Sequence, residues 1–184
     1  MASTLHIRSH SPEETQEIGR AIGAQARPGD IFLLTGPLGA GKTCLTQGIA
    51  WGLGVLEYAR SPTFVLMASY RGRLALHHLD LYRINDPLEA WDLGLDEQLF
   101  GDGVCVVEWA DRAGEVFPAH SLRIALDYAQ PVGAKYASAL QAKNKPSDSK
   151  RTITIFEAPP RYDLLLEKLA STFAVVKTEH DPGH

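Results

Sequence analysis

The octapeptide Gly36-Pro37-Leu38-Gly39-Ala40-Gly41-Lys42-Thr43 lies between two segments of different periodicity. The segment before it, Ile31–Thr35, is a continuous apolar run, which is typical of a strand covered on both faces. The segment after it carries Leu45, Ile49 and Leu53 at helical spacing. A strand, a G-x-x-x-x-G-K-T loop and a helix in this order predict a phosphate-binding loop, because the glycine backbone N–H groups and the helix N-terminus together attract anions.

Each position of this loop has an expected task. We expect the backbone to hold the phosphates of a nucleotide, and the residues predicted to contact it are Gly36, Leu38, Gly39, Ala40, Gly41, Lys42, Thr43 and Cys44. The Lys42 ammonium is predicted to bridge the β- and γ-phosphates, which makes it a catalytic group. The Thr43 hydroxyl is predicted to bind Mg²⁺, a hard cation that prefers small oxygen ligands.

Such a loop also needs an acidic group at a strand end, either to hold Mg²⁺ or to orient the attacking water. Glu108 follows the apolar run Val104–Val107, and Asp80 follows a less apolar run that includes His77 and His78. The residues alone leave open which acid takes which task. Adjacent strand residues point to opposite faces, so we expect the two histidines to pack or hydrogen-bond rather than share a metal.

The pattern along the chain predicts an α/β fold, a three-layer P-loop NTPase with a mixed sheet. Helices are expected at 11–26, 42–53, 86–93, 95–100 and 162–169, and strands at 31–35, 64–70, 73–79, 104–107, 122–127 and 152–156. Strands 31–35 and 104–107 should be parallel, side by side or one apart, with antiparallel strands added from 64–79 and 122–156. Ser11 should cap the first helix, in a capping box with Glu14.

We predict one domain over residues 1–176 and a frayed tail over 177–184. Residues 129–150 form a locally basic stretch rich in Ala, Lys, Ser and Pro. Its composition favours a solvated loop or insertion, and a contact with RNA or protein is the alternative.

Composition narrows the function classes. The 184 residues carry 18 Lys and Arg against 22 Asp and Glu, which gives 18 − 22 = −4, so the chain as a whole is no cationic surface for nucleic acid or anionic lipid. The two cysteines have no metal-binding or disulfide spacing, which favours a reducing cytoplasm. No apolar run is long enough for a membrane span.

The expected nucleotide is ATP rather than GTP. Asn144-Lys145-Pro146-Ser147 imitates a guanine-reading N-K-x-D motif, but Ser147 stands at the reading position and the segment lies in the basic stretch. Asp111-Arg112-Ala113-Gly114 imitates the D-x-x-G of guanine-nucleotide switches but comes three residues too late after its strand.

Four motifs in order make the chain resemble a known family. They are the 36–43 loop, Ser61-Pro62-Thr63-Phe64, His78-Leu79-Asp80-Leu81-Tyr82-Arg83 and Val107-Glu108-Trp109. Together they resemble the bacterial TsaE family over about residues 11–127, a family that takes part in threonylcarbamoyladenosine synthesis on tRNA.

The resemblance implies an Mg²⁺-dependent ATPase that supports a complex of TsaD and TsaB type proteins, which modifies the adenosine next to the tRNA anticodon. It implies Thr43 and Glu108 as Mg²⁺ ligands and Asp80 as the residue that supports hydrolysis. Thr63 would belong to a nucleotide-sensing switch, and Trp109 would lie beside the nucleotide. The tRNA itself would be contacted indirectly or weakly.

One departure concerns a Gly-Arg pair that members of the family carry after the penultimate strand. Here Gly133-Ala134-Lys135 is followed by about 15 further residues before Arg151, so either Lys135 or Arg151 is a candidate to replace that arginine.

Two alternative functions are compatible with the same glycine-rich loop. One is a small-molecule kinase, and the other is a scaffold that binds ATP without turnover.

Overall fold

The apolar run that precedes the glycine-rich loop forms the central strand of the fold. This strand, β2 (Ile31–Thr35), lies between β5 (Val104–Glu108) and β6 (Leu122–Tyr128) and pairs in parallel with both. Its first four residues are buried. A strand covered on both faces needs apolar side chains pointing both ways, which explains why the run is unbroken.

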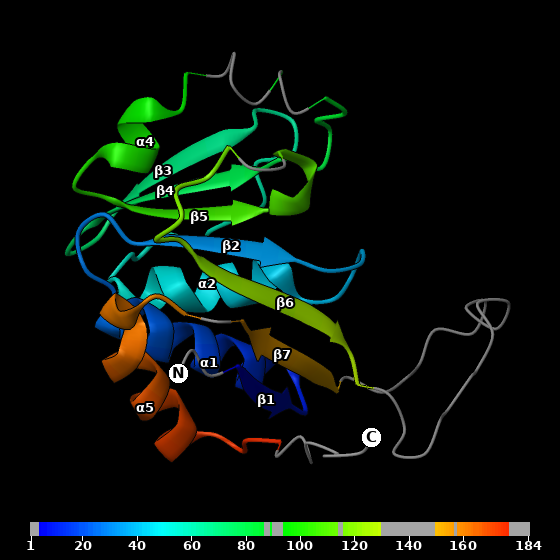
Figure 1. Cartoon of the computed structure of the whole chain (residues 1–184). Helices are drawn as coiled ribbons and strands as arrows, with labels where there is room; N and C mark the ends of the chain where they lie inside the picture. Colours follow the sequence, from blue (N-terminus) through cyan, green and yellow to red (C-terminus); the bar gives the residue numbers. More distant parts are fainter. Residues whose placement is uncertain are drawn as a thin grey trace, which may run out of the picture.

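The computed structural model describes residues 4–86, 89, 94–113, 116–129, 150–156 and 158–176. Within these residues seven strands form one sheet in the order β1-β7-β6-β2-β5-β4-β3 (Figure 1). The remaining strands are β1 (Leu5–Ser9), β3 (Met67–Arg71), β4 (Ala75–Asp80) and β7 (Arg151–Ile155). The parallel core consists of β4, β5, β2 and β6, whose arrowheads in Figure 1 point the same way.

The sheet is mixed as predicted, but two strand directions differ from the expectation. β4 and β6 belong to the parallel core, whereas β3, β7 and β1 each pair antiparallel with a neighbour. The connections from β4 to β5 and from β5 to β6 each return the chain to the starting end of the sheet, which makes the next strand parallel.

The strand expected from Phe64 begins only at Met67. The Val65 and Leu66 N–H groups both donate to the Pro62 carbonyl, at 2.9 and 2.7 Å, and Leu66 has a φ of 65°. Residues 62–66 therefore form a turn that leaves the side chains of Phe64 and Val65 exposed.

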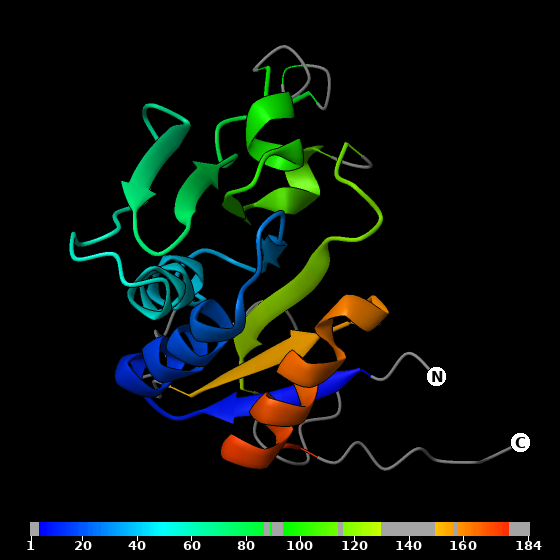
Figure 2. The ribbon, with the colours of Figure 1, turned by 90° about the vertical axis from the view of Figure 1, so that its left-hand side faces the viewer.

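Helices cover both faces of the sheet and complete the three predicted layers. One face is covered by α1 (Pro12–Gln25), α2 (Lys42–Gly52) and α5 (Asp163–Thr172). The other face is covered by α4 (Asp96–Phe100) and the 3-10 turn η1 (Ala110–Ala113). A second 3-10 turn, η2 (Pro160–Tyr162), leads into α5. Figure 2 shows α1 and α2 lying side by side.

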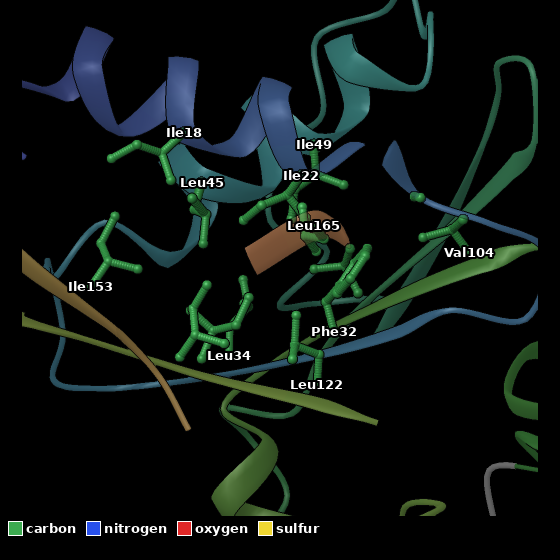
Figure 3. Close-up of a cluster of buried hydrophobic side chains, with 14 of the residues drawn as sticks. Ile18, Ile22, Phe32, Leu34, Leu45, Ile49, Val104, Leu122, Ile153 and Leu165 are labelled. Carbon is green, nitrogen blue, oxygen red and sulfur yellow. The ribbon is translucent and has the colours of Figure 1, made fainter. Parts of the chain in front are cut away.

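The alternation of β2 side chains divides the core into two clusters. Phe32 and Leu34 point toward α1 and α2, where they meet Ile18 and Leu45 among others (Figure 3). Ile31 and Leu33 point to the opposite face and pack in the second cluster. The larger cluster fixes α2, and with it the end of the glycine-rich loop, against the sheet.

The first element, β1, was not predicted from the sequence, although Leu5 and Ile7 alternate with polar residues as a strand requires.

The cap of α1 was predicted in part. Ser11 accepts the Glu14 N–H at 3.1 Å as expected, but the Glu14 carboxylate accepts the His10 N–H at 2.6 Å instead of completing the box with Ser11.

Three predictions fall mainly outside the described residues. These concern the helix at 86–93, the basic stretch at 129–150 and the tail at 177–184. The two ends of the basic stretch are described, and the Ala129 N–H donates to the Lys150 carbonyl at 3.1 Å. The stretch therefore leaves and rejoins the sheet at one point, between β6 and β7.

Glycines allow α1 and α2 to approach closely. A Cβ added at Gly19 would lie 2.3 Å from the Leu45 carbonyl oxygen, and one added at Gly48 would lie 2.1 Å from the Gln16 carbonyl oxygen. Both contacts are with backbone, which cannot move aside as a side chain can.

We expect Gly48→Ala to lower the free energy of unfolding by about 1–3 kcal/mol, the usual cost of overpacking. Helix propensity alone would favour alanine by about 1 kcal/mol, so the sign of the change reports the close contact. Urea unfolding measures it, with Gln25→Ala on the exposed side of α1 as a control. A Gly48→Ala protein as stable as the native one would contradict the packing described.

Candidate nucleotide-binding site

The 36–43 loop needs glycine at its turns. Gly36, Gly39 and Gly41 have φ values of 130°, 77° and 105°, in the left-handed region that residues with a side chain rarely adopt. A Cβ on Gly36 would also lie 2.0 Å from the Leu126 carbonyl oxygen of β6. The loop ends at Gly41, which is the N-cap of α2 and leaves the first N–H groups of that helix without a side-chain cap.

Lys42 folds back over the loop that precedes it. Its Nζ donates to the carbonyl oxygens of Gly36 and Pro37, at 2.6 and 2.9 Å, and lies 3.7 Å from the centre of the Trp109 ring. Burial lowers the pKa of the Lys42 ammonium, and the carboxylates of Glu108, Asp111 and Asp80 oppose that shift. The end of the Lys42 side chain is therefore held between two loop carbonyls and the Trp109 ring.

Glu108 is brought to the loop by the pairing of parallel strands. It is the last residue of β5, opposite Leu34 of β2, and the loop begins two residues further on. The Thr43 Oγ1 donates to Glu108 Oε2 at 2.8 Å. A hydroxyl and a carboxylate are both oxygen ligands of the kind that Mg²⁺ prefers, so the chemistry of this pair fits the predicted metal site.

Within the described residues no group of three or more His, Cys, Asp or Glu side chains is arranged to hold a metal ion. The Thr43 and Glu108 pair would supply two ligands. Mg²⁺ at phosphate sites keeps several waters and takes the remaining ligands from the substrate phosphates, so a pair is sufficient.

Asp80 ends β4 and lies opposite Glu108 in the sheet register. Its Oδ2 accepts the Ser61 and Thr63 hydroxyls, the second at 2.6 Å, and its Oδ1 accepts the Tyr82 N–H at 2.9 Å. Asp80 therefore holds the segment around Ser61-Pro62-Thr63 against the sheet.

Two aromatic rings form one side of the site. Trp109, which has a φ of 58°, and Tyr82 lie with ring centres 5.0 Å apart. The Arg112 guanidinium lies within 6 Å of the centre of each ring. Tyr82 was not predicted as a site residue, although it stands in one of the motifs quoted above.

These groups surround a pocket of about 400 Å³. The residues that line it are Leu38, Gly39, Gly41, Lys42, Thr43, Cys44, Ser61, Thr63, Asp80, Tyr82, Glu108 and Trp109. The structure thus brings together ten of the residues predicted for the site and adds Ser61 and Tyr82.

Gly36 and Ala40 do not line the pocket. Gly36 contributes the carbonyl that holds Lys42, and the Ala40 side chain is fully buried in the larger core cluster. The Ala40 N–H donates to the Pro37 carbonyl at 3.2 Å, within the loop. Both residues therefore shape the loop.

Arg151, one of the two candidates to replace the arginine of the Gly-Arg pair, lies beside the loop. Its Nη2 donates to the Gly39 carbonyl at 3.3 Å, and its guanidinium stacks 4.5 Å from the Tyr128 ring centre. The Tyr128 hydroxyl donates to the Leu38 carbonyl at 2.8 Å. Lys135, the other candidate, lies outside the described residues.

The central parallel strands, the glycine loop and the helix after it define the P-loop class of α/β domain. Residues 9–135 match the family described as "Threonylcarbamoyl adenosine biosynthesis protein TsaE", and the chain belongs to this family.

Several relatives carry the name tRNA threonylcarbamoyladenosine biosynthesis protein TsaE. The protein of Bacillus subtilis is 41% identical over 167 residues, which cover 90% of this chain and 94% of that protein. The protein of Treponema pallidum is 42% identical over 118 residues, covering 64% of this chain and 87% of that protein.

The fold agrees with a solved structure. The crystal structure of Bacillus subtilis YdiB superposes with a TM-score of 0.71 at 37% sequence identity, covering 93% of this chain and 97% of that one.

In the part of the chain that the structure describes, none of the helices has the length and apolar character needed to cross a membrane.

Cys44 lines the pocket, and its thiol forms a hydrogen bond with the backbone at the start of α1. Its Sγ donates to the Pro12 carbonyl at 3.1 Å, and burial, with a contribution from Glu13, raises the pKa of the thiol to about 11. Burial raises the pKa of Cys105 to about 12, and that side chain is fully buried.

Because the thiolate is the reactive form, we expect iodoacetamide at pH 8 to alkylate Cys44 about 100-fold more slowly than a free cysteine, and Cys105 more slowly still. Mass spectrometry of timed samples measures both rates, and the chain unfolded in guanidinium is the control in which both thiols react freely. Alkylation of Cys44 at the rate of a free thiol would contradict the burial of its sulfur.

Proposed function

We propose that this protein is an Mg²⁺-dependent ATPase that acts in tRNA threonylcarbamoyladenosine biosynthesis. The observation that carries the proposal is the pairing of each acid with a hydroxyl from a different part of the phosphate site. Glu108 holds Thr43 of the loop, and Asp80 holds Thr63 of the 61–63 segment. Family membership supports the pathway, and the names of the relatives supply the modification.

In this proposal the loop backbone and Lys42 bind the phosphates of ATP. Gly41 gives access to the N–H groups at the start of α2. The Lys42 ammonium exchanges its two carbonyl partners for phosphate oxygens, a gain because a charge–charge hydrogen bond is stronger than one to a neutral carbonyl. Trp109 and Tyr82 form the wall beside the nucleotide.

Thr43 and Glu108 are the side chains that would hold Mg²⁺. When bound, the ion supplies positive charge at the β- and γ-phosphates and fixes their orientation. Glu108 is 2% exposed, so its charge lies in a site from which most water is excluded and acts there with little screening.

Asp80 is the proposed catalytic residue. Its carboxylate would orient the water that attacks the γ-phosphate and accept a proton from it, in exchange for one of the hydroxyls it now binds. Loss of a Ser61 or Thr63 hydroxyl contact by Asp80 weakens the attachment of the 61–63 segment, so turnover of the nucleotide would alter the adjoining 62–66 turn that carries Phe64 and Val65. The ATPase cycle is thereby coupled to a partner.

The proposed partner is the threonylcarbamoyl-transferase complex of TsaD and TsaB type proteins. The pathway supports this choice. The net charge of −4 argues against strong direct binding of tRNA, so the protein would act on the complex rather than on the nucleic acid.

Lys42→Ala and Asp80→Asn are expected to lose different properties, the first ATP binding and the second ATP turnover. Loss of the ammonium should weaken ATP binding at least about 10-fold, since a charge-assisted contact contributes about 1.5–3 kcal/mol. Asp80→Asn should keep ATP affinity within a few-fold and lower turnover about 10²–10⁴-fold. Calorimetric binding and phosphate release measure the two effects.

Asp163→Asn, an exposed acid at the start of α5, serves as the control for these variants. Full turnover by Asp80→Asn would exclude Asp80 as the residue that orients the water.

Coupling predicts that ATP turnover by the purified protein is slow and rises when the transferase complex and tRNA are added. The measurement is phosphate release with and without each component, with Lys42→Ala as the background. A rate indifferent to the complex would contradict coupling. ATP-dependent labelling of a metabolite in a substrate screen would favour the small-molecule kinase instead.

A further inference from the structure

The two oxygens of the Glu108 carboxylate have different partners. Oε2 accepts the Thr43 hydroxyl at 2.8 Å, at the pocket. Oε1 lies 2.8 Å from His78 Nε2 and 3.0 Å from the Thr46 Oγ1. His78 and Thr46 are both fully buried, and neither lines the pocket. The carboxylate therefore has one oxygen toward the pocket and one fixed inside the protein.

Of the two donors on Oε1, His78 is the one without a competing acceptor. The Thr46 hydroxyl also lies 3.0 Å from the Lys42 carbonyl oxygen, and its single proton serves only one acceptor at a time. Within the described residues the other ring nitrogen of His78, Nδ1, has no hydrogen-bond partner. A buried N–H without an acceptor is costly, so the ring proton belongs on Nε2, where it is donated to Glu108.

The position of His78 follows from the sheet. It lies two residues before Asp80 on β4, so both side chains point to the same face, and β4 pairs with β5 so that Asp80 lies opposite Glu108. His77, the residue between them, points to the other face and lies 3.0 Å from the Ser69 hydroxyl on β3. Only the second histidine can reach the Glu108 carboxylate.

We propose that His78 is a positioning residue for the metal site: it fixes Oε1 of Glu108 so that Oε2, next to Thr43, is the oxygen presented to the cation. This inference rests on the proposed function, because it assumes that Glu108 and Thr43 bind Mg²⁺. Without the His78 donor, Oε1 shares the proton of Thr46 with a helix carbonyl, and the carboxylate is free to rotate away from the geometry that an octahedral ion demands.

His78 itself is not a ligand in this arrangement. Its Nε2 is occupied by Glu108, Nδ1 is buried, and His78 is not among the residues that line the pocket. Removing the donor is therefore expected to alter the affinity for the cation and to leave the phosphate contacts of the loop intact.

The test measures cation binding directly. Mn²⁺ replaces Mg²⁺ as a paramagnetic probe, and its binding to the protein with a non-hydrolysable ATP analogue is followed by electron paramagnetic resonance. Affinity for the analogue alone is measured in EDTA. The variants are His78→Leu, which removes the donor, and His78→Gln, whose amide nitrogen can take the place of Nε2. His77→Leu and His77→Gln are the matched controls.

We expect His78→Leu to weaken Mn²⁺ binding about 10- to 100-fold, the usual effect of removing a group that orients a metal ligand. Affinity for the analogue in EDTA should stay within about 2-fold. His78→Gln should recover most of the Mn²⁺ affinity, and both His77 variants should behave as the native protein does. This pattern separates positioning from a general loss of structure, which would lower all affinities together.

Native-like Mn²⁺ affinity in His78→Leu would overturn the inference and leave the proposed function standing. The affinity of Mn²⁺ for the complex of native protein and analogue is also compared with its affinity for the free analogue. If the two affinities were equal, the protein would supply no metal ligand and the proposed metal site would be wrong. Should His78→Leu not fold, His78→Asn is compared with His78→Gln, because its shorter side chain places no donor near Oε1. Equal Mn²⁺ affinity of these two variants would also overturn the inference.

Discussion

The burial of a carboxylate at the end of β5 constrains the site and the elements around it. A buried charge is tolerated only when donors surround it, and Glu108 draws these donors from two other elements. Thr43 and Thr46 come from successive turns at the start of α2, and His78 comes from β4. The beginning of α2 is thereby tied to the sheet at the point where the glycine loop ends, so the loop cannot shift without breaking these bonds.

Two acids lie at the carboxyl ends of the neighbouring strands β4 and β5, and they differ in the groups that surround them. Asp80 and Glu108 lie opposite each other in register, and both are 2% exposed. Glu108 contacts α2, whereas Asp80 contacts Ser61 and Thr63, next to the 62–66 turn. One carboxylate thus contacts the start of α2 and the other contacts the 61–63 segment, a difference that the types of residue alone do not reveal.

The sequence was sufficient to predict most of the helices and strands and the glycine loop, because strand, glycine turn and helix each have their own pattern. It located Asp80 and Glu108 at strand ends, but only the register showed that they face each other. Thr46, Ser61, His78 and Tyr82 were missed as site residues because their roles depend on neighbours far along the chain. The directions of β4 and β6 depend on where the connections return. β1 is different, since the alternation of Leu5 and Ile7 could have revealed it.

The hydrogen bond between Ala129 and Lys150 has a consequence for how this fold can vary in evolution. For a segment whose two ends are already joined, each doubling in length adds only about 0.6 kcal/mol of closure entropy. Added length at this junction is therefore expected to cost the sheet little stability. Tyr128 and Arg151 flank the junction and contact the glycine loop, so sequence gained there enters the molecule next to that loop.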